Sequence, residues 1–382
     1  MYLDHAASTP LDPAVLAAMR PWLEGGFGNP SSQHALGRQA REAVEAAREQ
    51  VAGALGVTPL EVLFTSGGTE ADNQAVKGIA WTARAAGRGA HVVTTAIEHH
   101  AVLEAVEWLV AAQGFTATVV PPEPDGVVDP QRLLDAVRPD TVLVSVMAAN
   151  NEIGTLQPLD VVGPALRARG VPLHTDAVQA FGRAELCLDD WGIGALALSA
   201  HKFNGPKGVG LLVLRRDLAV QPLLHGGGQD RGVRSGTFNT AGIVGCGVAA
   251  ALAAVDLDTE PVRLGGLRDR LLDGLLAVDG VSLNGSRVRR LPHNAHVAVE
   301  GCDGEALLLA LDRASVCAST GSACQSGAAS FSHVLRAIGA PEDRAHLRFT
   351  CGRTTTDAEI ARAVEVFSDA VTNLRAAGGG YL

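Results

Sequence analysis

Several features that mark other classes of protein are scarce in this 382-residue sequence. Its six cysteines contain no Cys-x-x-Cys pair, and a chain of this length needs no disulfide staples, so we expect reduced thiols. No apolar run approaches the roughly 18 residues that a membrane span needs. The N-terminus shows no basic segment followed by an apolar one, so we expect no secretory signal and a cytoplasmic location.

Positive charge is scarce as well. The chain carries 31 Lys and Arg residues against 41 Asp and Glu residues, which gives a net charge of -10. Because non-specific binding to nucleic acid requires clustered Lys and Arg, we expect no direct contact with nucleic acid. Hydrophobic residues, in contrast, make up 47% of the chain, and 44 residues are glycine. This composition is typical of a well-buried globular enzyme.

Strand-like apolar runs alternate with helical stretches over the first two thirds of the chain. The runs are 62–65, 91–95, 116–120, 141–147, 171–175, 195–198 and 208–214. This alternation predicts an α/β fold with a mostly parallel sheet and helices on both faces. Near residue 250 the pattern changes to long helices and few strands. We therefore predict a large domain over 13–250 and a smaller α+β domain formed by 1–12 and 251–382.

Two helices have recognisable ends. Ser31 or Ser32 is expected to cap a long helix that Gly56 ends. The last helix is expected to begin with the capping box Thr356-Asp-Ala-Glu359 and to end at the glycines after residue 377.

Polar residues follow the strand-like runs, where the ligands of parallel sheets bind. The run 195–198 leads into Ser199-Ala-His201-Lys202. A lysine at the end of a buried strand has an easily lowered pKa and can form a Schiff base with a carbonyl group. The alternative is a lysine whose stem is buried and whose charge reaches water.

Three other strand ends have similar features. Ser66-Gly-Gly68-Thr69 leads into a helix and suits a phosphate, although an ordinary capped turn fits equally well. It matches neither the P-loop nor the dinucleotide-binding spacing. His99, beside His100, suits stacking on a flat ring or proton transfer, and adjacent histidines do not share a helix face as metal ligands would. Asp176 is placed to keep a pyridine ring protonated.

Two glycine-rich loops complete the candidates. One contains Arg234 and Thr237, which suit phosphate or carboxylate groups, although a plain connector is the alternative. The other, about 318–332, places Cys324 among small polar residues, as expected for an exposed nucleophilic thiol. Cys246 and Cys317 have apolar neighbours and are expected to be buried.

Taken in order, these motifs resemble the cysteine desulfurases, which belong to class V of the fold type I enzymes that use pyridoxal 5'-phosphate. The resemblance extends over nearly the whole chain and rests on the following segments: Tyr2-Leu-Asp-His5, Gly28-Asn-Pro-Ser31, Phe64-Thr-Ser-Gly-Gly-Thr-Glu70, Glu98-His99, Asn150-Asn-Glu-Ile-Gly154, Asp176-Ala-Val-Gln179, Ser199-Ala-His-Lys202, His225-Gly-Gly-Gly228, Arg234-Ser-Gly-Thr237 and Ser319-Thr-Gly-Ser-Ala-Cys324. The length of the segment between Cys324 and His333 is similar to that of the flexible-loop group.

The resemblance implies a role for each residue at the cofactor. Lys202 would bind pyridoxal phosphate covalently, His99 would stack on its ring, Asp176 would pair with the ring nitrogen, and Gln179 would contact the phenolic oxygen. The residues expected to hold the phosphate are Gly68, Thr69, Ser199 and His201. Thr237 would reach the phosphate of the other subunit, which implies a homodimer.

The resemblance also implies the reaction. Asn151 and Arg348 would bind the carboxylate of L-cysteine, and Cys324 would take the substrate's sulfur as a persulfide, leaving L-alanine. A sulfur-acceptor protein would then receive the sulfur for iron–sulfur assembly, tRNA thiolation or another thio-modification. Two other functions stay open: a class V aminotransferase or lyase, such as a selenocysteine lyase, and a thiol-bearing adaptor without catalysis.

The sequence departs from the family pattern at three places. Ala200 replaces the usual glycine before the His-Lys pair, a change we expect to be tolerated if its φ is negative. Gln325 stands where Ser or Thr is commoner. The chain ends at Leu382, earlier than relatives whose C-terminal tail contacts an iron–sulfur scaffold, so we make no prediction about a scaffold partner.

Overall fold

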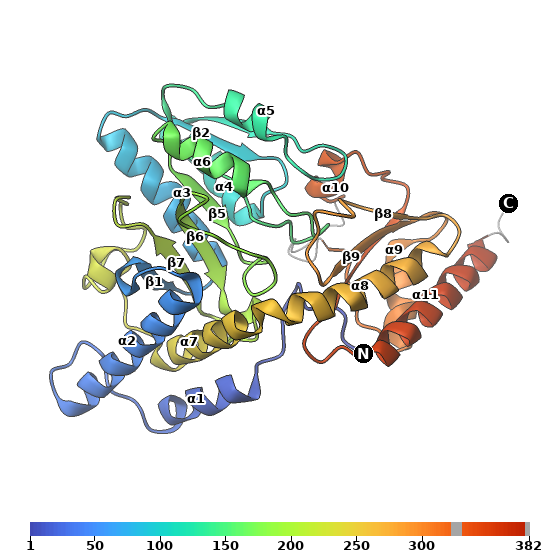
Figure 1. The fold of residues 1–382 in the computed structure, drawn as a ribbon, viewed down its shortest axis with the longest axis horizontal. Helices are drawn as coiled ribbons and strands as arrows, with labels where there is room; N and C mark the ends of the chain where they lie inside the picture. The colour runs from blue at the N-terminus through green and yellow to red at the C-terminus, as the bar shows by residue number, and fades with distance from the viewer. Residues whose placement is uncertain (322–330, 379–382) are drawn as a thin grey trace.

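A computed structural model describes residues 1–321 and 331–378 of the chain (Figure 1). Its α-helices are α1 (Pro13–Glu24), α2 (Ala35–Leu55), α3 (Gly68–Ala85), α4 (His100–Gln113), α5 (Pro130–Asp135), α6 (Leu159–Ala168), α7 (Thr240–Val255), α8 (Glu260–Leu276), α9 (Gly304–Arg313), α10 (His333–Ala337) and α11 (Asp357–Gly378). Its strands are β1 (Val62–Thr65), β2 (His91–Thr95), β3 (Thr116–Val120), β4 (Thr141–Ser145), β5 (Leu173–Asp176), β6 (Ile193–Ser199), β7 (Gly210–Leu214), β8 (Val281–Leu283), β9 (Asn294–Val299) and β10 (Ala345–Thr350).

Seven of these strands form one sheet in the order β1-β7-β6-β5-β4-β2-β3. β7 runs antiparallel to both of its neighbours, while the other neighbouring strands pair in parallel. This confirms the predicted mostly parallel α/β sheet. Strands with both faces buried need apolar side chains at successive positions, which explains the continuous apolar runs in the sequence.

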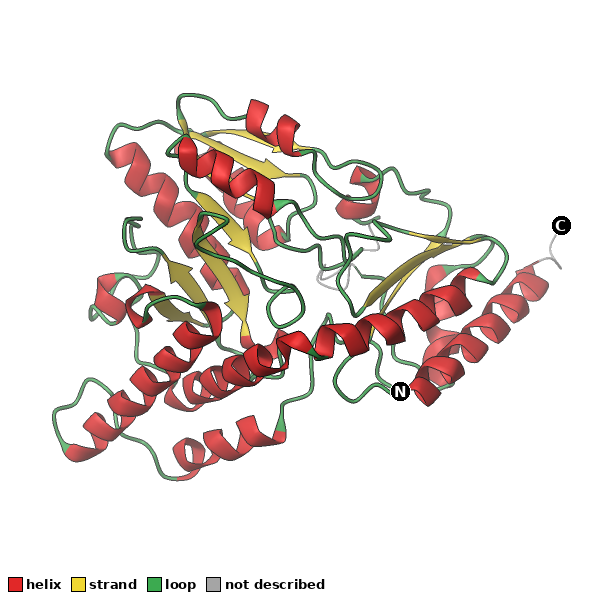
Figure 2. Cartoon of the chain, in the orientation of Figure 1, coloured by secondary structure: helices red, strands yellow, loops and turns green. Residues whose placement is uncertain are grey.

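The two faces of this sheet belong to two apolar cores, and helices cover both (Figure 2). In β6, Leu196 and Leu198 point into the core that includes residues of α2, α6 and α7. Ala195 and Ala197 point into the opposite core, with residues of α3 and α4. Alternate side chains of one strand thus serve different layers, as the pleat of a strand requires.

The other sheet has the order β10-β9-β8 and is antiparallel. It packs with α8, α9 and α11 around a third core, to which Leu3 of the N-terminal arm also belongs. In Figure 1, α8 extends from the region of α7 to this smaller sheet. The predicted α+β character of the C-terminal region agrees with these elements, and the domain boundary near residue 250 stays a prediction.

The structure corrects the predicted start of α2. His34, not Ser31 or Ser32, caps this helix, because its Nδ1 accepts the N–H of Gly37 at 3.3 Å. The N–H groups of Ser31 and Ser32 instead bond to Asn29 in the preceding turn. Gly56 ends α2 as predicted, with a φ of 66°.

Two expectations were wrong, namely that Cys317 is buried and that no apolar run approaches the length of a membrane span. Cys317 is exposed, as is Tyr2, with which it forms an isolated β-bridge, whereas Cys246 is buried as predicted. The stretch Thr240–Asp258 is long and apolar enough, with a mean hydropathy of 1.8, to match a membrane span by composition. Its α7 portion packs against α1 and α2 as a core helix. The five cysteines that the structure describes are all free thiols.

Candidate active site

The carboxyl ends of the parallel strands surround a cavity of about 430 Å³. β1 runs parallel to β6, since both are antiparallel to β7, so its end lies at the same edge. Ten of the residues selected from the sequence line this cavity: Gly68, Thr69, His99, Asn151, Asp176, Gln179, Ser199, His201, Lys202 and Arg348. They come from six separate stretches of sequence. The direction of the parallel strands brings five of these stretches together, and Arg348 reaches the cavity from β10 of the smaller sheet.

Lys202 lies in a 3-10 turn, Ala200–Lys202, that directly follows β6. Its Nζ donates hydrogen bonds to the carbonyls of Ala6 and Ala7 at 2.6 and 2.9 Å. The N-terminal arm is therefore part of the site. Ala200 is buried and is not among the described residues with positive φ, so the backbone condition under which we expect this replacement of glycine to be tolerated is met.

The start of α3 forms a cradle for an anion. Gly67 and Gly68 place backbone N–H groups at the first turn of an 18-residue helix, where negative charge is stabilised. A Cβ at Gly210 of β7 would lie 2.5 Å from the carbonyl carbon of Gly67, so only glycine allows this approach. Arg234 pairs with Glu70 at 2.8 Å and holds its own loop against the cradle.

A second part of the site suits a flat ring. His99 caps α4, and its Nδ1 accepts the N–H of Ala101 at 3.1 Å, which fixes the orientation of the imidazole. Asp176 ends β5, and one carboxyl oxygen accepts the N–H of Val178 at 2.9 Å. Burial raises the pKa of Asp176, while the charges of His99 and Lys202 oppose this shift. A cation beside Asp176 would stabilise its ionised form.

Arg348 supplies a cation for a carboxylate. Its side chain is 3% exposed, and its two Nη atoms donate to Asp4 at 2.9 Å and to the carbonyl of Asn151 at 2.7 Å. A guanidinium group has five N–H donors in a planar fork. Its Nε has no hydrogen-bond partner in the described part of the chain, so donor capacity is left for a ligand.

The cavity fits pyridoxal phosphate on the chemistry of its lining. Among the described residues, Oδ1 of Asp72 and Oε1 of Gln179 also have no hydrogen-bond partner, although both side chains are buried. Buried polar groups of this kind need a polar ligand or water. The cradle at Gly68 supplies N–H donors for a phosphate, and Lys202 supplies an amine for an aldehyde.

One selected residue that the structure describes, Thr237, is not brought into this cavity and is exposed on the loop that Arg234 anchors. Cys324 lies outside the described residues. The sequence analysis also missed part of the lining, namely Ala6, Ala7, Asp72, Met147, Val178 and Gly321. A signal was available for Asp72, because it follows Thr69 by three positions and so shares its face of α3.

The comparisons with known proteins agree with this geometry. The family model described as "Aminotransferase class-V" matches residues 1–362. The chain belongs to the class-V aminotransferase family. Enzymes of this family use pyridoxal phosphate, which confirms the cofactor inferred from the sequence.

Relatives within the class-V family are cysteine desulfurases, which confirms the resemblance. The chain is 47% identical to the IscS-like cysteine desulfurase of Mycobacterium tuberculosis, covering 98% of this chain and 97% of that one. It is 45% identical to cysteine desulfurase IscS of Methanosarcina thermophila, covering 98% and 93%. A solved NifS-like protein superposes with a TM-score of 0.91 at 35% identity, covering 98% of this chain and all of the other.

Proposed function

We propose that this protein is a pyridoxal-phosphate-dependent cysteine desulfurase, which converts L-cysteine to L-alanine and leaves a persulfide on Cys324. One observation carries the proposal: Lys202, Asp176 and Arg348 line a single cavity in a chain that is 45% and 47% identical to cysteine desulfurases. These three residues supply an amine, a carboxylate and a guanidinium group, and each serves a different part of this reaction.

Each residue of the cavity then has an assigned task. Bound pyridoxal phosphate supplies a ring that accepts the negative charge of the substrate's α-carbon. We assign Lys202 to its covalent attachment, His99 to one face of the ring, Asp176 to the ring nitrogen and Gln179 to the phenolic oxygen. The phosphate is assigned to the residues around the cradle, namely Gly68, Thr69, Ser199 and His201.

The chain's own groups carry out the proton and sulfur transfers. Arg348 and Asn151 bind the carboxylate of L-cysteine and orient its thiol. The free amine of Lys202 removes the α-proton as a general base. The Cys324 thiolate attacks the substrate's sulfur, and the carbon–sulfur bond breaks with its electron pair on the carbon side. One proton completes the methyl group of alanine, and a second is returned to the α-carbon. The sulfur remains on Cys324 as a persulfide.

We further propose a homodimer in which Thr237 reaches the phosphate of the other subunit. The exposure of Thr237 supports this proposal, because Thr237 does not line the cavity of its own subunit and is accessible to the cofactor cavity of a second subunit. Its loop is held against α3 by the pair between Arg234 and Glu70. Sedimentation of the purified protein tests the dimer, and Thr237→Ala should weaken cofactor retention.

The persulfide sulfur is passed to an acceptor protein. One of the two desulfurases above is named IscS and the other IscS-like, which favours iron–sulfur cluster assembly as the receiving pathway. We also propose that the enzyme is cytoplasmic. We propose two domains, one formed by 13–250 and the other by 1–12 with 251–382, since the two sheets have separate cores.

The test compares wild type, Cys324→Ser and Lys202→Ala. We expect a visible cofactor band in wild type and Cys324→Ser, because Cys324 is not assigned to cofactor binding. Alanine and sulfide should form from L-cysteine and a reductant only in wild type. Full turnover of L-cysteine by Cys324→Ser would contradict the persulfide and favour another class V reaction. A wild type that does not bind pyridoxal phosphate would favour the adaptor.

A further inference from the structure

One carboxyl group at the cofactor cavity has no task in the assignments above. Asp72 lies on α3, one turn after Thr69, and lines the same cavity as Lys202 and Asp176. Its side chain is 1% exposed. Buried aspartates are normally paired with a cation or fully hydrogen-bonded, because a buried charge is costly.

Asp72 satisfies neither condition within the described residues. Its Oδ1 accepts no hydrogen bond, and the group that approaches it most directly is Nε2 of His174, at 3.5 Å. His174 itself is held through Nδ1 by the hydroxyl of Ser145 at 2.9 Å. Burial lowers the pKa of His174 to about 3, so this imidazole is neutral and gives Asp72 no counter-charge.

The nearest carboxyl group on the cavity side is Asp176. One carboxyl oxygen of each aspartate and one ring nitrogen of His99 all lie within 4.8 Å of one another. The ionisable groups that face Asp72 from the neighbouring elements are His174 and Asp176 of β5, Glu98 and His99 after β2, and Lys202 after β6. Burial raises the pKa of Asp72 well above its usual value, and the charges of Asp176 and Glu98 raise it further.

Two carboxyl groups this close cannot both ionise without a neighbouring cation, so such a pair holds one proton between its members. Asparagine would fill the same space without this cost. Because the buried carboxyl group of Asp72 destabilises the fold, its presence indicates a functional role. The charges of His99 and Lys202 act on Asp176, yet burial still raises the pKa of both aspartates. The proposed function places a further cation beside Asp176, the protonated ring nitrogen of the cofactor.

We propose that Asp72 is a positioning residue, which forms a proton-sharing pair with Asp176 and acts through it to raise the proton affinity of the cofactor's ring nitrogen. This inference rests on the assignment of Asp176 to that nitrogen. With the ring protonated, both carboxyl groups can be ionised, and the second negative charge stabilises the ring cation. Without Asp72, only one negative charge opposes loss of the ring proton.

The test uses Asp72→Asn, which keeps the shape and removes the charge. The protein is loaded with pyridoxal phosphate labelled with ¹⁵N in the ring, and solid-state NMR follows the nitrogen signal against pH. We expect the midpoint of ring deprotonation to fall by about one pH unit or more, about a tenfold loss of proton affinity. Asp72→Ser should give the same shift if the asparagine variant does not fold.

A second measurement uses the protein without cofactor. The raised pKa of Asp72 makes folded wild type bind a proton that the unfolded chain releases above a pH of about 4. This cost to the folded state grows as the pH rises from there toward the folded pKa, and asparagine does not have it. We therefore expect Asp72→Asn to raise the Tm of the cofactor-free protein, and to raise it more at pH 8 than at pH 5.

Asp230→Asn is the matched control. Asp230 is also a buried aspartate, but it pairs with Arg48 at 2.9 Å and lies outside the cofactor cavity. Its variant should lower the Tm, because Arg48 loses its buried partner, and should leave the nitrogen midpoint unmoved. An unmoved midpoint in Asp72→Asn, with or without a change in Tm, would overturn the inference.

Asp176→Asn separates this inference from the proposed function. If Asp176 holds the ring proton, its variant should shift the nitrogen midpoint by more than Asp72→Asn does. A ring nitrogen that is unprotonated in wild type, or unaffected by Asp176→Asn, would overturn the assignment of Asp176. A response to Asp176→Asn without any response to Asp72→Asn would overturn only the inference about Asp72.

Discussion

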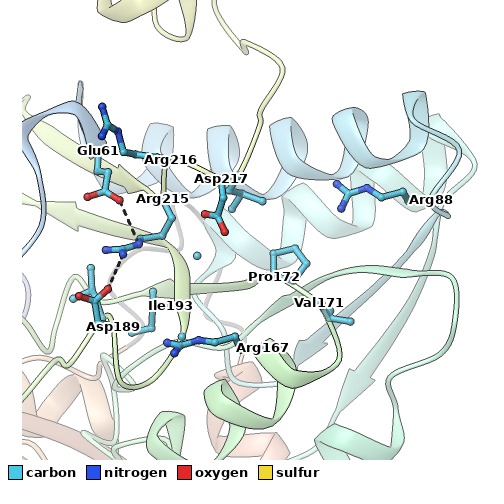
Figure 3. Close-up of a pocket in the computed structure, with 15 residues that line it drawn as sticks. Glu61, Arg88, Arg167, Val171, Pro172, Asp189, Ile193, Arg215, Arg216 and Asp217 are labelled. Atoms are coloured by element: carbon cyan, nitrogen blue, oxygen red, sulfur yellow. Dashed lines mark ion pairs between the residues drawn. The ribbon is translucent and has the colours of Figure 1, made fainter.

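One cavity lies at the carboxyl ends of the parallel strands of the seven-stranded sheet and another lies at their amino ends, and the two cavities have different linings. The cavity at the amino ends of β5 and β6 is larger, at about 740 Å³ (Figure 3). Its charged lining consists of Glu61, Arg88, Arg167, Asp189, Arg215, Arg216 and Asp217. None of the described residues selected as catalytic or cofactor-binding lies there. The cavity at the carboxyl ends, about 430 Å³, contains ten of them.

The charges of the two cavities are satisfied in different ways. At the amino end, Arg215 pairs with Glu61 at 3.3 Å and with Asp189 at 2.6 Å. Glu61 is buried, but the side chains of Arg215 and Asp189 are 28% and 70% exposed. At the carboxyl end, Asp176 and Arg348 are buried. Partly solvated ion pairs contribute little free energy, whereas buried charges are costly and act strongly on a ligand. Cavity volume alone would select the amino-end cavity as the active site, whereas the direction of the strands selects the carboxyl-end cavity.

The largest difference in activity between variants of the two cavities is expected from Arg348→Ala, at the carboxyl-end cavity. Loss of the guanidinium group should lower kcat/KM for L-cysteine by about a hundredfold or more, since a charge-assisted bidentate contact is lost. Arg348→Lys should recover only part of this loss, because an ammonium group lacks the planar fork. Steady-state kinetics measures both variants.

The control for Arg348 is Arg167→Ala, at the other cavity. It should leave kcat/KM within about twofold of wild type, as expected for an exposed side chain remote from the reaction. Equal losses of kcat/KM in Arg167→Ala and Arg348→Ala would mean that the reaction does not depend on the carboxyl-end cavity more than on the amino-end cavity.

A smaller effect is expected at His99, which combines two tasks. His99→Ala should lose both the ring face and the helix cap, lowering kcat by about tenfold or more and stability by about 1 kcal/mol. His99→Asn should keep the cap, because asparagine is a good N-cap, and lose only the ring face. Comparing the Tm of the two proteins without cofactor, and then their cofactor affinity, separates the tasks. Equal Tm values would show that the bond to Ala101 does not stabilise α4.

Sequence alone was sufficient where local chemistry decides the outcome. The strand ends, the capping box at Thr356, whose N–H and hydroxyl both bond to Glu359, and the cavity position of Lys202 could all be predicted. Each depends on a short stretch of chain and on the rule that parallel strands end at one edge.

Sequence was insufficient where a structural feature depends on contacts between distant segments or on the hydrogen bonds within a turn. The arm that places Ala6 and Ala7 on Lys202 is nearly two hundred residues away from it in sequence. The spacing of Asp72 from Thr69 places both on one face of α3, but only the packing of α3 against the sheet buries Asp72 beside Asp176. At α2, Ser31 and Ser32 belong to a turn closed by their N–H bonds to Asn29, so the helix begins later, at Ala35, and His34 caps it.

The smallest effect is expected at the amino-end cavity, from Arg215→Ala. Glu61 loses a cation there, but its Oε2 still accepts the N–H and the hydroxyl of Thr58, both at 2.9 Å. Asp189 returns to water. We therefore expect a loss of about 1 kcal/mol or less in unfolding free energy, decreasing with added salt, and no change in kcat. Denaturant titrations at low and high salt measure it. A loss of about 3 kcal/mol would mean that the ion pairs at this end are as tightly coupled as the buried charges at the other.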